Sequence, residues 1–252
     1  MNRAIITITL TALLFATICS AEAADVRAFH NINQLPLKHI FGLPSLDNNP
    51  LTKRGQWRFG VISNISNTYN YSIKADDETL NDVETFRGSL NVSYGLRDNW
   101  QLSLAIPYIS HDGGFLDDFI YDWHDFFNMP QNGRTKEESD QLQISYYANS
   151  GTSFELTDSE KGLGDIRINA AYSRPWRKRA LIFSGEIKLP TGDYDKLTGS
   201  GGFDLSLGLT INDPLSLQKY RITLYGGLAG IFLGDSDGEL AEIQNNFALA
   251  GR

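Results

Sequence analysis

Hydrophobic and polar residues alternate along much of this chain, most clearly between residues 86 and 108. Two arms, residues 86–96 and 100–108, carry large apolar side chains at every second position and mostly small polar ones between them. A period of two predicts β-strands with one apolar face. The short polar link at residues 97–99 predicts an antiparallel hairpin. Each arm has about the ten residues that a tilted strand needs to cross a bilayer, with aromatic residues near its ends.

The same alternation continues before and after this hairpin, giving seven clear arms and an incomplete eighth near Phe247. The other clear arms are residues 57–65, 166–172, 181–189, 203–211 and 220–232. The face opposite the apolar one is polar, and it includes Arg87, Asn91, Arg167, Glu186, Lys188 and Asp204. A polar second face suits a hydrated lumen, although a soluble β-sandwich could instead turn it to solvent.

The connections between the arms alternate between long and short. The long ones are residues 67–84, 110–161 and 190–202, and the short ones are residues 97–99, 174–179 and 212–219. A sandwich has no reason to collect its long loops at one end, whereas outer-membrane barrels have short periplasmic turns and long outer loops. We therefore predict an all-β fold, an antiparallel transmembrane outer-membrane β-barrel, across residues 55–252.

The two ends of the chain carry further signals. Residues 1–23 have a positive start, an apolar stretch and a small-x-small site ending at Ala23, which predicts a secretory signal peptide. Cys19, the one cysteine, lies in it. Residues 24–54 are turn-rich, and we interpret them as a lumen plug or a periplasmic arm. The chain stops at Arg252, early in a strand, so either a small barrel ends crudely or the chain is a fragment, which we favour.

The insertion at residues 110–161 contains a predicted amphipathic helix. Residues 116–127 place an apolar stripe at helical spacing, and Asn128-Met129-Pro130 ends it. We expect this helix in a long extracellular loop, either on the outer side or folded into the barrel mouth. A polar turn at residues 149–151 between apolar alternations predicts an extension hairpin above the membrane.

Several motifs together resemble one bacterial family. They are Asn33-Gln34, Phe41-Gly42-Leu43-Pro44, Ile106-Pro107-Tyr108, Gly113-Gly114-Phe115-Leu116-Asp117, Asp122-Trp123-His124-Asp125-Phe126-Phe127, Gly162-Leu163-Gly164-Asp165 and Lys188-Leu189-Pro190-Thr191-Gly192-Asp193. The chain is similar over its whole mature length to the family called domain of unknown function 3187. This resemblance implies an outer-membrane location in a Gram-negative bacterium and carries no activity with it.

The insertion also holds the one constellation that suggests a binding or active site. Its residues are His111, Asp112, Asp117, Asp122, Trp123, His124 and Asp125. Two histidines with carboxylates could hold a cation or form an acid–base pair, but the acids equally suit the solvated face of a helix. The sequence has no Gly-x-Ser-x-Gly elbow and no phosphate-binding loop that ends in Lys-Ser/Thr. We therefore predict no catalytic residue, metal or cofactor.

The charge and the pattern leave three hypotheses of function. A net charge of -8 argues against nucleic acid as a partner. The first hypothesis is a passive or gated conduit for small polar or amphipathic solutes, with the loop helix as its gate. The second is a lipid-acting enzyme that uses His111 or His124, and the third is a structural or assembly protein that grips a partner through the loop helix. Outer-membrane lipid and the barrel-assembly machinery are the expected partners.

Overall fold

The computed structural model describes residues 33–41, 51–74, 76–131, 133–134, 139–177, 179–220, 222–236, 238 and 247–251. The predicted signal peptide and most of residues 24–54 lie outside these ranges. The described part is all-β, with eleven strands in one antiparallel sheet and two short α-helices. The predicted fold class is therefore confirmed at this level.

The strands follow the predicted arms closely. They are β1 (Trp57–Lys74), β2 (Asp77–Arg97), β3 (Trp100–Asp112), β4 (Gln143–Tyr147), β5 (Ser153–Leu156), β6 (Glu160–Leu163), β7 (Arg167–Trp176), β8 (Arg179–Lys188), β9 (Asp204–Leu217), β10 (Ile222–Leu233) and β11 (Phe247–Gly251). The helices are α2 (Pro36–His39) and α3 (Asp117–Phe126), with a 3₁₀ turn η2 at Gln218–Tyr220. The sheet order is β11-β10-β9-β8-β7-β3-β2-β4-β5, β1 pairs with β2, and β6 pairs with β3.

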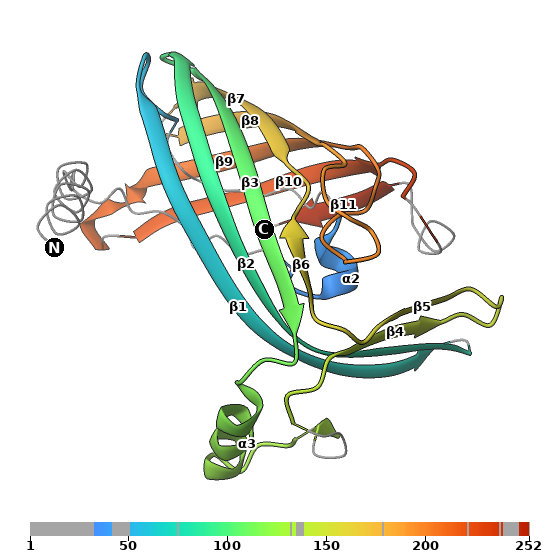
Figure 1. Cartoon of the computed structure of the whole chain (residues 1–252). Coiled ribbons are helices and arrows are strands. Elements are labelled where there is room, and N and C mark those ends of the chain that lie inside the picture. Colours follow the sequence, from blue (N-terminus) through green and yellow to red (C-terminus); the bar gives the residue numbers. More distant parts are fainter. Residues whose placement is uncertain are drawn as a thin grey trace, which may run out of the picture.

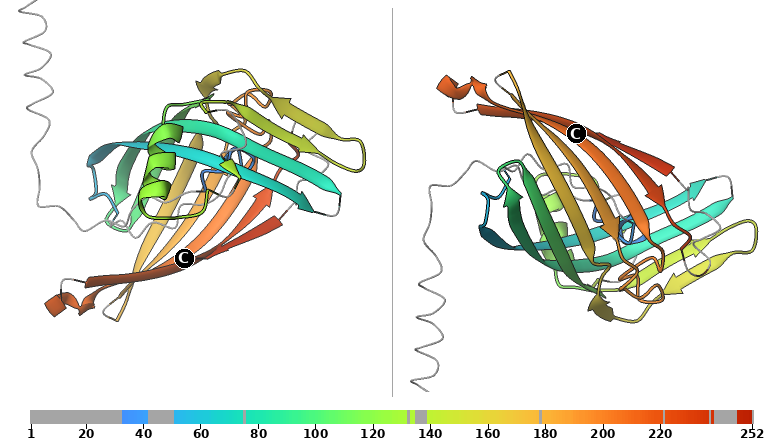
Figure 2. Two further views of the ribbon diagram at one scale, coloured as in Figure 1. Left: turned by 90° about the horizontal axis from the view of Figure 1, so that it is seen from below. Right: turned by 90° about the horizontal axis from the view of Figure 1, so that it is seen from above.

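The sheet curls into a trough whose two sides are β1–β3 and β7–β11 (Figures 1 and 2). Among the described strands it stays open, because β1 pairs with β2 alone and β11 with β10 alone. Barrel closure needs the first and last strands to pair along their length. The five residues of β11 offer a short edge to the eighteen of β1. The predicted closure is therefore not met in the described structure.

The first hairpin is much longer than predicted. Most of residues 67–84, predicted as a polar loop, are paired strand: residues 67–74 pair with residues 77–84, and the ladder runs from Trp57↔Tyr94 to Lys74↔Asp77. A tight turn closes it, with Asp76 at a φ of 72°, a conformation that Asp tolerates. The prediction was wrong because polar residues are frequent here, although Tyr69, Tyr71 and Ile73 keep the period of two. Eighteen strand residues span roughly 60 Å, about twice a bilayer's hydrocarbon core.

The hydrophobic core lies at the long-loop end of the trough. The part of β2 that β3 does not reach pairs with β4, and β4 pairs with β5. These two short strands form the predicted extension hairpin. Ile144 and Leu197 are fully buried there, in a cluster with Ile40, Val83, Tyr146, Phe154, Leu156 and Tyr194. The residue just beyond α2 thus packs with β2, β4, β5 and the 190–202 loop, and apolar side chains fill this end.

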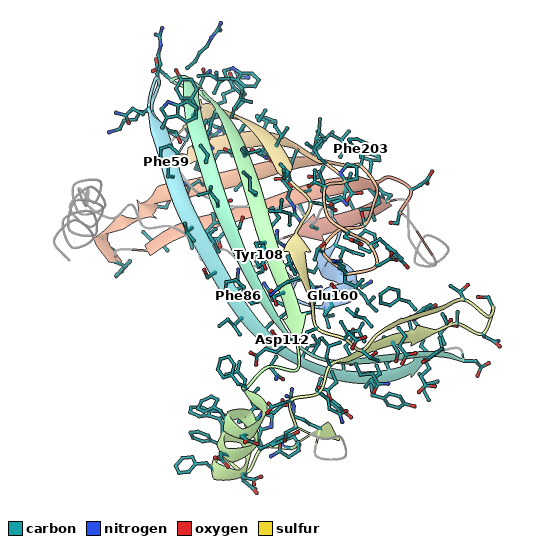
Figure 3. The ribbon with its side chains drawn as sticks, viewed as in Figure 1. Phe59, Phe86, Tyr108, Asp112, Glu160 and Phe203 are labelled. Carbon is teal, nitrogen blue, oxygen red and sulfur yellow. The ribbon has the colours of Figure 1, made fainter. Side chains whose placement is uncertain are left out.

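The two faces of the sheet differ in polarity, as the alternation predicts. Large apolar side chains on the outer face are exposed, including Phe59, Phe86 and Tyr108 on neighbouring strands (Figure 3). On the inner face, charged and hydroxyl side chains are buried. Within the described ranges, no helix has both the length and the apolar character needed to span a membrane.

Candidate functional site

The inner face is organised around the ammonium group of Lys188, which is 1% exposed. Its Nζ lies 2.8 Å from Asp165 Oδ2 and 3.1 Å from Asp204 Oδ2, and it donates to the Ser200 hydroxyl. It also donates to the carbonyl of Ile40 at 3.2 Å. Burying a charge is costly unless it is paired and hydrogen-bonded. The group therefore fixes β8, β9, the 190–202 loop and the N-terminal segment (residues 33–41) against one another.

Asp165 joins the two recurrent loop motifs, Gly-Leu-Gly-Asp and Leu-Pro-Thr-Gly-Asp. Its Oδ1 accepts from the backbone N–H groups of Thr191 and Gly192, at 3.1 and 2.8 Å, and its Oδ2 accepts from Ser200 N–H. A Cβ at residue 199 would lie 2.4 Å from Asp165 Oδ1, so only glycine fits there. The segment Gly199-Ser200-Gly201-Gly202 therefore packs into the interior, where Ser200 is fully buried.

The N-terminal segment lies inside the trough, between its two sides (Figure 2). Three cations from three strands hold it. Arg87 of β2 donates to His39 Nε2, Arg167 of β7 donates to the Phe41 carbonyl at 3.2 Å, and Lys188 of β8 reaches the carbonyl of Ile40. α2 is a four-residue turn, too short to be stable alone. Its position therefore depends on these side chains and on the apolar cluster around Ile40.

His39 is neutral in this setting. Burial lowers its pKa well below the ordinary value of 6.5, and the nearby charges of Arg87 and Arg167 lower it further, with a smaller contribution from His111. Arg87 can only donate, so Nε2 accepts and Nδ1 carries the proton. Nδ1 is buried without a hydrogen-bond partner among the described residues. A second proton would place a cation beside two guanidinium groups.

A polar cavity of about 340 Å³ lies on the inner face, lined by β1, β2, β3, β7, β8 and β9. Its charged side chains are Arg58, Arg87, Arg167 and Glu186. Amides and hydroxyls make up much of the remaining lining, including Asn64, Ser89, Asn91, Ser93, Gln101, Ser103, Asn169, Ser184 and Thr210. The predicted polar lumen face thus surrounds a space large enough for a small solute.

The sequence-predicted cluster around His111 and His124 is divided by the sheet. His111 is fully buried on the inner side, where its Nδ1 lies 2.9 Å from the Thr85 hydroxyl and its Nε2 lies 3.1 Å from the Leu197 carbonyl. Asp112, the next residue, ends β3 and has the opposite parity. His124 belongs to α3, so the two histidines do not form one site.

α3 attaches to the outer face of β1 and β2. Glu84 accepts from the backbone N–H groups of Phe115 and Leu116, at 3.4 and 3.2 Å, at the start of the helix. Glu84 has the same strand parity as the exposed Phe86, so the helix lies outside the trough. Gly114, with a φ of 83°, allows this contact, because a Cβ there would lie 2.4 Å from Glu84. The predicted alternative in which the helix folds into the barrel mouth is therefore not observed.

Asp117 is the buried anchor of α3. It accepts from the Asn67 amide and from Arg134, each at 2.9 Å, and from the backbone N–H of Asp140 at the same distance. The other candidate residues of the helix, Asp122, Trp123, His124 and Asp125, are exposed or half-buried. Among the described residues, no three His, Cys, Asp or Glu side chains are arranged to hold a metal ion. The acids therefore act as a structural anchor and a solvated face.

The motifs that build these contacts belong to one family. The family model described as protein of unknown function (DUF3187) matches residues 4–252. This chain belongs to the DUF3187 family. The family resemblance predicted from the sequence is confirmed. No curated protein matches the chain.

Replacing Lys188 by Met should destabilise this DUF3187 chain strongly, because Asp165 and Asp204 would stay buried without their cation. We expect a loss of about 3–5 kcal/mol in the free energy of unfolding, measured by urea titration of the refolded protein. Lys196→Met is the matched control, because Lys196 pairs with Glu160 at 3.4 Å in a half-buried setting, and its loss should cost less than about 1 kcal/mol. Equal losses would contradict the central role of Lys188.

His39 should make stability depend on pH. Its folded-state pKa lies below its unfolded value of 6.5, so the unfolded chain takes up the proton first as pH falls. Stability is therefore fully present above pH 6.5 and is lost as the pH falls below it. We expect His39→Gln to reduce this loss in urea titrations between pH 7.5 and about 5, with His124→Gln in α3 as the control. An unchanged pH profile in His39→Gln would exclude His39 as its source.

Proposed function

We propose that this chain forms the wall of an outer-membrane β-barrel whose polar interior is a gated conduit for small polar solutes. The observation that carries the proposal is the exposed apolar outer face of the sheet. Val61 is 75% exposed and Leu228 is 72% exposed, on strands at opposite sides of the trough. Soluble monomers rarely leave continuous apolar patches above a few hundred Å² in water. A lipid surface accepts such a face without cost.

The inner face supports the conduit. A spanning strand pair needs lipid-facing and lumen-facing residues in alternation, and β2 shows it with exposed Leu90 beside cavity-lining Asn91. The exposed aromatic residues at the short-turn end, Trp57, Trp100 and Trp176, are of the kind that favours a membrane–water interface. Long hairpins and loops leave the opposite end, which we assign to the outer side.

The gate in this proposal is the segment around α2. It lies within the trough (Figure 2). Ile40 belongs to the apolar cluster of the long-loop end, and His39 and Phe41 accept from two arginines that line the cavity. α3, the gate proposed from the sequence, is bonded to the outer face at Glu84 and is therefore less suited to block the interior. The lipid-acting enzyme gains no support from the geometry, because His111 and His124 lie on different sides of the sheet.

A charge on the outer face should prevent insertion, whereas the same charge on the inner face should not. Leu90→Lys is expected to cost about 2–4 kcal/mol in lipid. This variant should therefore give no heat-modifiable band after refolding in the presence of phosphatidylcholine vesicles. Asn91→Lys, one residue along the same strand, should fold like the wild type. If Leu90→Lys folds as well as Asn91→Lys, the outer face does not meet lipid.

A second candidate function, docking through α3, is favoured by its exposed aromatic face. Phe119, Trp123 and Phe127 contact one another in sequence, with ring centroids 6.0 and 4.7 Å apart. The start of the helix contacts Glu84, which lies two residues from the exposed Phe86 on β2. In this proposal the lipid band would end there. Aromatic side chains favour this membrane–water interface.

We expect Trp123 to lie at the lipid surface. Brominated phospholipids should quench part of the tryptophan fluorescence of the folded protein, and Trp123→Phe should remove that part. If quenching is the same in both proteins, the aromatic face does not meet lipid. A protein that co-purifies with the wild type and is lost from Trp123→Ala would then identify it as a protein-docking surface.

A further inference from the structure

The charge of the cavity is opposite to that of the chain. The full sequence has a net charge of -8, yet the charged side chains that line the cavity are three arginines and one glutamate. Arg58, Arg87 and Arg167 come from β1, β2 and β7, so they enter from two sides of the trough. Side chains of one sign in a cleft with low-dielectric walls concentrate ions of the other sign.

The carboxylates near the cavity are already engaged. Asp165 and Asp204 are paired with Lys188, and they are 4% and 3% exposed. Glu186 lies 3.9 Å from Arg167 and can offset one of the three cations. The lining therefore keeps an excess of positive charge toward the open space.

The neutral groups around the arginines suit an oxyanion. In the strand register, Arg58 lies opposite Ser93, Ser93 opposite Ser103, and Ser103 opposite Asn169. Guanidinium groups match carboxylate and phosphate oxygens with paired N–H donors, and hydroxyl and amide groups add further donors. Pores that select anions use rings of such cations.

We propose that this cavity binds small anions that carry a carboxylate or phosphate group, with Arg58 and Arg87 as the principal contacts. The inference rests on the proposed conduit function and names its solute class. Glu186 acts against the anion and limits its affinity. The site then favours release of the solute as well as entry, which conduction requires.

Binding of inorganic phosphate to the full chain, folded in detergent micelles, tests the proposal without any current. Calorimetric titration at constant ionic strength should show saturable binding, weakened about tenfold in Arg58→Gln through loss of a charged hydrogen bond. Glu186→Gln should bind several-fold more tightly, a gain that a misfolded variant would not show. Arg97→Gln, an exposed arginine at the β2–β3 turn, is the matched control and should bind like the wild type. Acetate in place of phosphate separates the carboxylate from the phosphate preference.

Two results would overturn the inference: no saturable binding of either anion, or equal affinities in Arg58→Gln and Arg97→Gln. Bilayer recordings separate it from the conduit itself. Phosphate binding without any current would remove the conduit and keep the anion site. A steady current with no anion binding and no preference for chloride over potassium would keep the conduit and remove the anion site.

Discussion

The interior of this protein depends on one buried ammonium group and the carboxylates that neutralise it. Lys188 of β8 has four partners from different parts of the chain: Ile40 of the N-terminal segment, Asp165, Ser200 of the 190–202 loop and Asp204 of β9. Because an unpaired charge at this position would be costly, Asp165 and Asp204 must stay beside the ammonium group. The glycines of the 190–202 loop let its backbone reach Asp165. The wall and its contents are thus fixed by the same contact.

The polar interior and the apolar exterior follow from the same period of two. In the function that we propose, lipid accepts the exposed side chains of the outer face, while the arginines and hydroxyls of the inner face line a cavity with an excess of positive charge. The apolar cluster around Ile144 closes the long-loop end, where the sheet extends on β1, β2, β4 and β5. The proposed membrane wall and solute cavity would then share one curved sheet with an apolar end.

The sequence predicts the wall well and the interior poorly. The arms of β2, β3, β7 and β8 were predicted because apolar and polar side chains alternate without interruption. Residues 67–84 were mistaken for a loop because polar residues are frequent there, although Tyr69, Tyr71 and Ile73 keep the period of two. α2 was missed because four residues carry no period.

The candidate site illustrates the same limit. The pairing of Lys188 with Asp165 and Asp204 joins strands through folded loops, and no spacing rule indicates it. The two motifs that contain Asp165 and Gly192 were identified in the sequence. The contact between them in the folded chain was not predicted. His111 and His124 are close in the sequence, one at the end of β3 and the other in α3. However, the His111 side chain lies on the inner side of the sheet, and α3 lies against the outer side.

The long first hairpin has a consequence for the order in which the chain assembles. Its ladder grows from a turn at Lys74↔Asp77, between residues that are neighbours in the chain, so little loop entropy opposes it. The contacts inside the trough join residues far apart: 86 positions between His111 and Leu197, and 148 between Lys188 and Ile40. Such contacts form after the hairpins that carry them. The N-terminal segment is therefore among the last parts to settle, after the wall strands that hold it have paired.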